Sequence, residues 1–310
     1  MPFSHSSSSD VTAPLALAIG QFDGVHLGHQ AVFHAAVTAA RKRNGIAGCL
    51  TFHPHVAAVL NPDHAPPLLA TQAQNQALIT ACGISTIHTI PFTRALAAMS
   101  PAQFLALLKA EFPSLTDIVV GQNFTFGKNR AGNAATLPAL AQTAGLQARI
   151  VTHIEYGGAP ISSTRIRAAV VGGDLPLARA LLGHPFALAG EVIRGRAVGR
   201  TLGFPTANVR PILPIRPAPG IYAARLHLQD GAHPGAAFIP DPADAGQAHF
   251  GSVVEIHIPG FDRDLYDHDV EISFTRRLRG HMAFPDPATA SAQIARDSRQ
   301  ALDVDAQDNP

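Results

Sequence analysis

Cysteine is scarce in this chain of 310 residues, because only Cys49 and Cys82 are present. They form neither a Cys-x-x-Cys pair nor a Cys/His cluster. The sequence therefore gives no sign of a disulfide framework or a zinc finger, and we expect a protein of the reducing cytoplasm.

An excess of charge of one sign is also lacking, since 23 Lys and Arg stand against 22 Asp and Glu. No overall field would attract nucleic acid or an anionic membrane surface, and we expect neither as a partner. An anionic ligand would have to be bound by local geometry.

Long apolar runs are missing as well. The run from Leu15 to Ile19 is far shorter than the roughly 20 residues of a membrane helix, and the polar N-terminus lacks the features of a secretion signal. We expect residues 1–12 to be disordered. The remaining length suits about two domains.

Residues 14–154 alternate short apolar runs with segments of helical periodicity. This alternation predicts an α/β domain with a parallel sheet covered on both faces and ligands at the carboxyl ends of its strands. The loops after Ile19, Phe52 and Val120 should then lie along one edge of the sheet.

The pattern changes after Ile161. Residues 162–183 predict two helices joined by Gly172-Gly173-Asp174. Four short alternating segments then predict a small antiparallel barrel or sandwich; they are 187–193, 220–228, 252–258 and 268–274. We expect 231–250 to be a loop because it has three prolines and no clear periodicity, and we expect a helix over 287–302.

The most informative stretch is GQFDGVHLGH, residues 20–29. Gly24 allows a tight turn, and His26 and His29 share one face at the start of a predicted helix. The helix dipole, free N–H groups and two imidazoles together suit a phosphate undergoing nucleotidyl transfer. A metal site is one alternative, although no third ligand is nearby, and a purely structural pair is another.

Five segments extend this motif into a family resemblance. They are GQFDGVHLGHQ at 20–30, TFHPH at 51–55, VVGQNFTFGKNRAGN at 119–133, ISSTRIR at 161–167 and LLGHPFALAGEVIRGRAVGRTLGFPTANV at 181–209. In order and content they resemble the prokaryotic bifunctional riboflavin kinase/FMN adenylyltransferases, the FAD synthetases. The resemblance implies a Rossmann-like nucleotidylyltransferase domain over 13–184, a β-barrel riboflavin kinase domain over 185–303 and a loose tail over 304–310.

For the first module, the resemblance implies transfer of AMP from ATP to FMN with release of pyrophosphate. His26 and His29 would hold the ATP phosphates and stabilise the transition state. Further nucleotide contacts are implied for Gly20, Phe22, Asp23, Gly24, Gly28, Asn123, Ser163, Thr164 and Arg167. Ser and Thr at a helix start also serve as N-caps, and the two roles are compatible.

For the second module, the resemblance implies phosphorylation of riboflavin by ATP with Mg²⁺ or another divalent metal. Thr206 and Asn208 would ligate the metal and ATP phosphates, and Glu255 would be the catalytic base. The phosphate-binding stretch would comprise Gly199, Arg200, Gly203 and Phe204.

Two departures from the family pattern lie in the kinase half. Residues 235–246 read GAAFIPDPADAG where the family has a segment like VANIGxRPTF, and Asp267 replaces the glycine of DLYG. We expect a weakened kinase, and strain at Asp267 if its φ is positive. A monofunctional FMN adenylyltransferase, a flavin-nucleotide sensor and a different nucleotidyltransferase are the alternatives. The sequence does not predict the oligomeric state.

Overall fold

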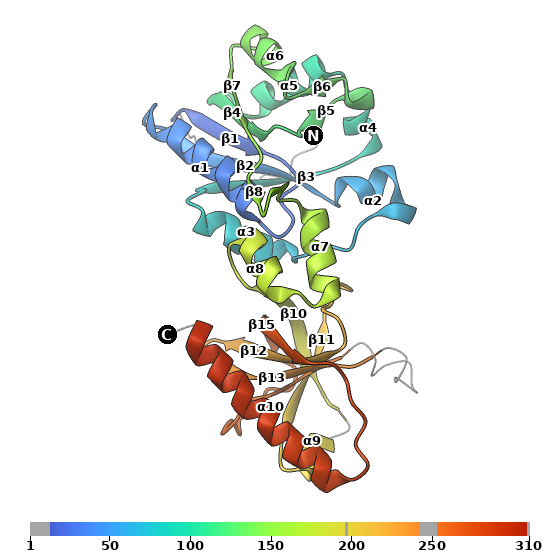
Figure 1. The fold of residues 1–310 in the computed structure, drawn as a ribbon. Helices are drawn as coiled ribbons and strands as arrows, with labels where there is room; N and C mark the ends of the chain where they lie inside the picture. The colour runs from blue at the N-terminus through green and yellow to red at the C-terminus, as the bar shows by residue number, and fades with distance from the viewer. Residues whose placement is uncertain (1–12, 196–197, 242–252, 309–310) are drawn as a thin grey trace. The chain divides into compact units, whose positions relative to one another are not determined.

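The computed structural model describes residues 13–195, 198–241 and 253–308, and the chain forms two compact units (Figure 1). The first unit comprises Met1–Pro66 and Gln72–Ile161, and the second comprises Pro67–Thr71 and Ser162–Pro310. The segment predicted to be disordered, 1–12, lies outside the described residues. The domain boundary at 184/185 stays a prediction.

The first unit contains the predicted parallel sheet. Five strands lie in the order β3-β2-β1-β4-β7, and every neighbouring pair is parallel. The strands are β1 Leu15–Ile19, β2 Ile46–His53, β3 Thr86–Pro91, β4 Leu115–Gly121 and β7 Gln147–Val151. Because β1 and β4 are adjacent at the centre, the segments that follow them leave the same edge of the sheet.

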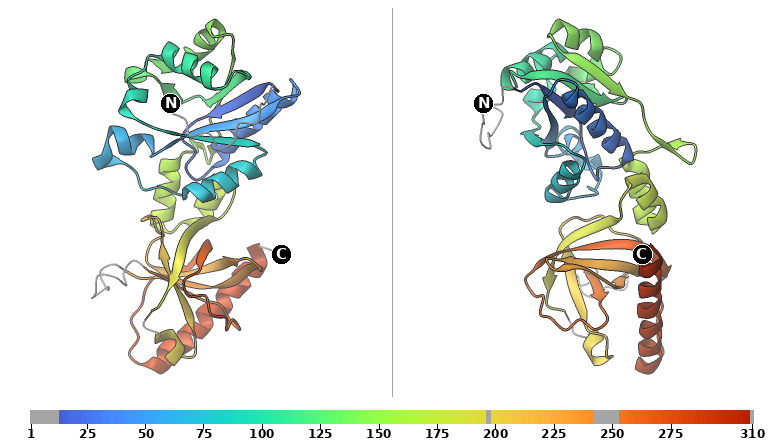
Figure 2. Two further views of the ribbon diagram at one scale, coloured as in Figure 1. Left: turned by 180° about the vertical axis from the view of Figure 1, so that it is seen from behind. Right: turned by 90° about the vertical axis from the view of Figure 1, so that its left-hand side faces the viewer.

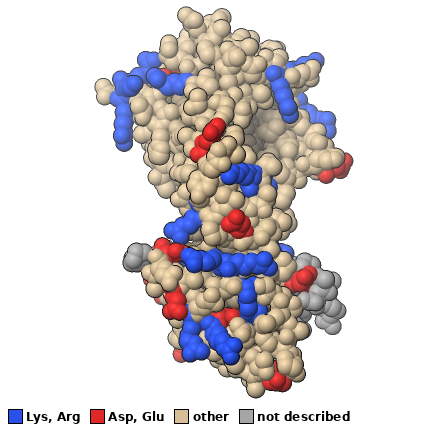
Figure 3. All heavy atoms as spheres, viewed as in Figure 1, with Lys and Arg blue, Asp and Glu red and all other residues tan. Residues whose placement is uncertain are grey.

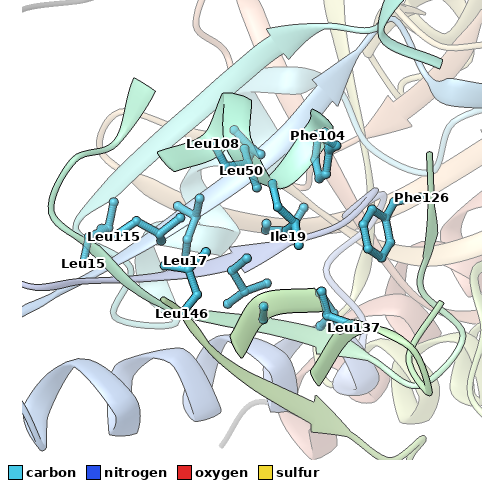
Figure 4. Packing of buried hydrophobic residues seen from close by; sticks show 14 of the residues in the cluster. Leu15, Leu17, Ile19, Leu50, Phe104, Leu108, Leu115, Phe126, Leu137 and Leu146 are labelled. Atoms are coloured by element: carbon cyan, nitrogen blue, oxygen red, sulfur yellow. The ribbon is translucent and has the colours of Figure 1, made fainter. Parts of the chain in front are cut away.

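Both faces of this sheet are covered. Leu15, Leu17 and Ile19 of β1 face helices α5 (Pro101–Glu111) and α6 (Leu137–Thr143) in one apolar cluster, as Figure 4 shows. Ala16 and Ala18, which alternate with them, face α1 (Leu27–Arg41) and α3 (Gln72–Ala81) in the other cluster. The helices are α1 Leu27–Arg41, α2 Val56–Leu60, α3 Gln72–Ala81, α4 Arg94–Ala97, α5 Pro101–Glu111 and α6 Leu137–Thr143.

Short elements complete the first unit. Two small antiparallel hairpins pair β5 with β6 and β8 with β9. Their bounds, with those of two 3₁₀ turns, are β5 Thr125–Phe126, η2 Lys128–Arg130, β6 Gly132–Asn133, β8 Glu155–Tyr156, β9 Ala159–Pro160 and η1 Pro62–His64.

The second unit contains the predicted helix pair and a closed antiparallel barrel. Six strands close in the order β10-β11-β14-β13-β12-β15. The barrel strands are β10 Phe186–Ile193, β11 Thr206–Pro211, β12 Gly220–Leu228, β13 Gly231–Ile239, β14 Val254–His257 and β15 Asp269–Arg279. The helices of this unit are α7 Ser163–Gly172, α8 Leu175–Leu182, α9 Val198–Thr201 and α10 Pro287–Asp308.

The loop prediction for 231–250 is wrong in its first part. Residues 231–239 form β13, which pairs with β12 along its whole length and with β14 at Ala236–Phe238. Gly235, Ala237 and Ile239 point into the barrel, but two of these are too small to give a clear apolar alternation. Residues 240 and 241 belong to no helix or strand, as predicted, and 242–250 lie outside the described residues.

The C-terminal helix is longer than predicted. Helix α10 runs to Asp308 against the outside of the barrel (Figure 2), so 304–308 are helical instead of loose. Val304 is buried, and the carboxylate of Asp305 accepts a hydrogen bond from Arg225 Nη2 at 2.8 Å. Burial of Val304 and this ion pair stabilise the last turns of the helix. The sequence of these turns is too polar to show a helical apolar periodicity.

The surface charge and the lengths of the helices bear on what the protein could bind. On the face viewed in Figure 3, acidic and basic side chains both occur on each unit, and much of the surface carries neither. Among the described residues, no helix is both long and apolar enough to span a membrane.

The backbone at Asp267 is left-handed, with φ of 62°, as expected for a residue that replaces a glycine. Left-handed backbone costs an L-residue about 1–2 kcal/mol, less for Asp than for most. The substitution Asp267→Gly at this exposed position removes that cost but makes the unfolded chain more flexible, which opposes the gain. The free energy of unfolding should therefore rise by up to about 1 kcal/mol.

Chemical denaturation of the wild type and this variant tests the expectation. Asp262→Gly in the same loop is the matched control. It should not raise the free energy of unfolding, because Asp262 is not among the residues with left-handed backbone. Equal or lower stability of Asp267→Gly would show that the aspartate is not strained.

Candidate active sites

The turn between β1 and α1 builds the first site. Gly24 and Val25 both have positive φ, 75° and 39°. Glycine adopts this region freely, but for a β-branched residue it is a real outlier. Val25 is 1% exposed and packs in the cluster beneath α1. Such strain persists only where the surroundings impose it, and it concentrates at functional sites.

The strained turn places both histidines at the start of α1. His26 is the N-cap, and its Nδ1 accepts a hydrogen bond from the backbone N–H of His29 at 3.2 Å. The two imidazole rings stack with centroids 3.5 Å apart. Since Nδ1 of His26 is an acceptor, its proton lies on Nε2.

His29 is held as a neutral imidazole. Burial, and secondarily the neighbouring His26, keep the pKa of His29 well below its ordinary value of 6.5. Within the part of the chain that the structure describes, Nδ1 of His29 is buried and has no hydrogen-bond partner. A buried polar atom without a partner is costly in a folded protein, and a bound ligand at this helix start would satisfy it.

The neighbouring predicted residues lie in the same turn. Phe22 is buried and packs edge-on against the His29 ring at 5.2 Å, and Asp23 is 3% exposed. A Cβ at Gly20 would lie 2.9 Å from the Phe22 ring, and one at Gly28 would lie 3.1 Å from the His26 ring. Both glycines therefore leave room for the aromatic rings of the site.

Asn123 follows β4 at the same edge of the sheet and is exposed. The aromatic residues after it differ in burial. Phe126 is buried in the core beside Phe104, and the half-buried Phe124 stacks on it at 5.5 Å. The structure thus makes Phe126 a core residue and leaves Phe124 partly accessible.

The predicted phosphate clamp begins helix α7 in the second unit. Its N-cap is Ser162, whose hydroxyl accepts from the N–H of Arg165 at 3.3 Å. The capping function therefore falls on Ser162, so Ser163 and Thr164 are not N-caps. Arg167 donates from Nε to the carbonyl of Pro67 at 2.6 Å. A clamp function for Ser163, Thr164 and Arg167 stays a prediction.

The second site lies on the outer face of the barrel, where β11 and β14 are paired and α10 packs over the strands. Thr206 is directly opposite His257, and Asn208 is directly opposite Glu255. Residues two apart on a strand share a face, and directly paired residues project to the same side. These four side chains line one cavity of about 460 Å³, and Thr206 Oγ1 lies 3.5 Å from Glu255 Oε2.

The stretch 199–204 contributes Gly199, Leu202 and Phe204 to the wall of this cavity. The N–H of Phe204 donates to the carbonyl of Gly199 at 2.8 Å, and that of Gly203 donates to the carbonyl of Arg200 at 3.2 Å. A Cβ on Gly199 would lie 2.4 Å from the Phe204 carbonyl oxygen. Only glycine permits this close approach, which fits the predicted phosphate-binding stretch.

Sequence reasoning missed part of the cavity wall. His257 donates from Nδ1 to the Pro205 carbonyl at 2.8 Å. Phe238 of β13, Arg279 of β15 and Asp297 of α10 also line the cavity, and the last two form an ion pair at 2.7 Å. No motif marks these residues, because distant segments bring them together.

Two family models match the chain in succession. The model described as FAD synthetase matches residues 8–165, and the model described as riboflavin kinase matches residues 182–304. Together they cover the residues of both described sites except Arg167.

Whole-length relatives agree with this division. The chain is 33% identical over 299 residues to the bifunctional riboflavin kinase/FMN adenylyltransferase of Escherichia coli strain K12, with 96% of this chain and 95% of the relative covered. It is 32% identical over 302 residues to the protein of that name from Bacillus subtilis strain 168, with the same coverage.

A solved structure is similar over most of its length. It is a crystal structure described as a macrolide-efflux protein from Streptococcus pneumoniae, with a TM-score of 0.79, 27% identity and 92% of each chain covered. The family rests on the sequence matches, which span both halves of the chain. The chain belongs to the bifunctional riboflavin kinase/FMN adenylyltransferase family and converts riboflavin to FMN and FAD.

Proposed function

We propose that the β1–α1 turn and the barrel cavity are the two reaction centres of this bifunctional enzyme. The observation that carries the proposal is the stacked pair of buried His26 and half-buried His29 at a helix start, with the buried Nδ1 of His29 left without a partner among the described residues. Each centre uses its own ATP, and FMN is the product of one reaction and the substrate of the other.

In adenylyl transfer, a phosphate oxygen of FMN attacks the α-phosphorus of ATP. The bond between that phosphorus and the bridging oxygen breaks, and pyrophosphate leaves. Negative charge builds on the α-phosphate oxygens in the transition state, where N–H donors of His26, His29 and the helix start stabilise it. As His29 is neutral, it supplies a directed N–H dipole instead of a full charge.

Other residues would position the nucleotides. Asn123, exposed at the carboxyl end of β4, offers an amide to the reacting nucleotides. The hydroxyls of Ser163 and Thr164 and the guanidinium of Arg167 suit the charged phosphate oxygens of ATP. These assignments come from the match of residues 161–167 and 119–133 to the family's motifs. The structure supports the first of them, because Ser162 is the N-cap of α7 and the capping function does not fall on Ser163 or Thr164.

In the kinase reaction, the terminal ribityl hydroxyl of riboflavin attacks the γ-phosphorus of ATP and ADP leaves. Glu255 accepts the proton of that hydroxyl as general base. Its carboxylate lies in the cavity beside Thr206 and opposite Asn208. The cavity is large enough for a flavin ring system, and its walls include Phe204 and Phe238.

The donor set of the cavity fits a hard divalent metal such as Mg²⁺. Thr206 offers a hydroxyl and Asn208 an amide oxygen, the ligand type that Mg²⁺ prefers. Among the described residues, no group of three or more His, Cys, Asp or Glu could hold a metal, so ATP phosphates would complete the coordination. Such a metal would neutralise charge on the phosphates.

The weakened kinase expected from residues 235–246 stays a prediction. The described part of this segment supplies Ala236 and Phe238 to the cavity wall, which supports an assembled kinase site. A cytoplasmic location and the absence of a nucleic-acid partner also stay inferences, from the scarce cysteine and the balanced charge.

Two substitutions should separate the reactions. His29→Ala should lower FAD formation from FMN by about a hundredfold or more, the scale of losing one transition-state donor. Glu255→Gln should lower FMN formation from riboflavin by about 100- to 10,000-fold, since it removes the general base. Initial rates of each reaction, with flavins resolved by chromatography, measure both effects.

Each variant is the control for the other, because each should keep the reaction of the untouched site near its wild-type rate. If His29→Ala still adenylylates FMN at the wild-type rate, the assignment of the first site is wrong. The corresponding result for Glu255→Gln would remove the assignment of the second.

The low pKa of His29 predicts an acid-sensitive fold. The unfolded chain protonates His29 at pH values just below 6.5, where the folded protein keeps it neutral, so stability is lost as the pH falls through this window. His29→Gln should reduce that loss by about 1 kcal/mol between about pH 6.5 and 5.5. Denaturant unfolding at several pH values measures it.

The exposed His34 of α1 provides the comparison for this measurement. His34→Gln should leave the acid dependence of stability as it is in the wild type. Identical pH slopes for the wild type and His29→Gln would mean that His29 is not held neutral by the fold.

A further inference from the structure

The strained turn at Gly24–Val25 needs an external anchor. Two consecutive residues there have positive φ, and one of them is a valine. Backbone of this kind costs about 1–3 kcal/mol for the strained residue and relaxes unless neighbouring groups hold it. The turn is followed directly by His26, so any relaxation reaches the imidazoles within one residue.

Two side chains hold the backbone of this turn. Gln30 of α1 donates from Nε2 to the carbonyl of Val25 at 2.9 Å. Asn75 of α3 accepts from the N–H of Gly24 through Oδ1, also at 2.9 Å. Gln30 moves with the helix that carries the histidines, whereas Asn75 belongs to another helix and ties the turn to the body of the unit.

Helix α3 is a firm support for this contact. Its Ile79 is 1% exposed and lies in the same apolar cluster as Val25, Phe33 and the small residues of β1. The Asn75 contact therefore fixes Gly24 against the packed core. Hydrogen bonds of this kind can define a geometry to a fraction of an ångström when the supporting side chain is itself held by packing.

We propose that Asn75 is a positioning residue for adenylyl transfer. By accepting the Gly24 N–H it holds the left-handed turn in the one conformation that stacks His26 on His29 and points both at the helix start. Asn75 itself touches neither substrate in this account. The inference rests on the proposed function of the two histidines.

The exchange of Asn75 for Ala tests the proposal in the full-length enzyme. Without the acceptor the turn relaxes and the two imidazoles shift. The kcat for FAD formation from FMN should then fall by about 10- to 100-fold, because displacing a catalytic group by about 1 Å can lower the rate by about 100-fold. The KM values for ATP and FMN should stay within about threefold, as for a change that acts mainly on the transition state.

Asn75→Asp is the conservative rescue, because a carboxylate oxygen can accept the same N–H. It should restore kcat to within about threefold of the wild type while its added charge raises the KM for ATP. Gln76→Ala, at an exposed position on the same helix, is the matched control and should keep wild-type kcat. The riboflavin kinase rate of each sample shows that the chain is intact.

The outcomes decide between positioning and mere stability. Wild-type kcat in Asn75→Ala, an equal loss in Gln76→Ala or no recovery in Asn75→Asp would each overturn the proposal. If Asn75→Ala fails to fold, Asn75→Ser replaces it, because its hydroxyl is too short to bridge to Gly24, and the same loss of kcat is expected. Wild-type activity of His29→Ala would instead overturn the proposed function on which the inference rests.

Discussion

The left-handed turn at Gly24–Val25 is the constraint on which the first unit's chemistry depends. Strand β1 ends at the centre of the sheet, and the chain must reverse within a few residues to start α1 at the same edge. That reversal forces a valine into a strained backbone, buries Phe22 and Asp23, and brings two imidazoles to a centroid separation of 3.5 Å. The same burial keeps His29 neutral, so the strain, the stacking and the protonation state have one origin.

The barrel reaches its site by a different constraint, the register of β11 against β14. With Asn208 opposite Glu255 and Thr206 opposite His257, the pleat sends a hydroxyl, an amide, a carboxylate and an imidazole into one cavity. A slip of the register by one residue would turn all the partners of one strand to the other face. Helix α10 covers the cavity from the outside of the barrel. The Arg279–Asp297 and Arg225–Asp305 ion pairs hold the helix there.

Sequence patterns predicted what is local. Apolar runs revealed the strands of the parallel sheet, and glycine and histidine spacing revealed the β1–α1 turn. The patterns failed at β13, whose small inward residues are stabilised by two neighbouring strands, and at the polar end of α10, which an ion pair extends. Asn75 and Phe238 lie far along the chain from the motifs they support, so only the fold shows their contacts with Gly24 and with the barrel cavity.

The central claim is that two reaction centres cleave ATP at different phosphates. Radiolabelled ATP tests this claim most directly. Purified enzyme is given riboflavin with ATP radiolabelled at either the γ- or the α-phosphate, and the flavins are then separated and counted. The account predicts γ-label in both FMN and FAD and α-label in FAD alone, while a reaction started from FMN puts no γ-label into any flavin. Failure of α-label to enter FAD, or of γ-label to enter FMN, would contradict it.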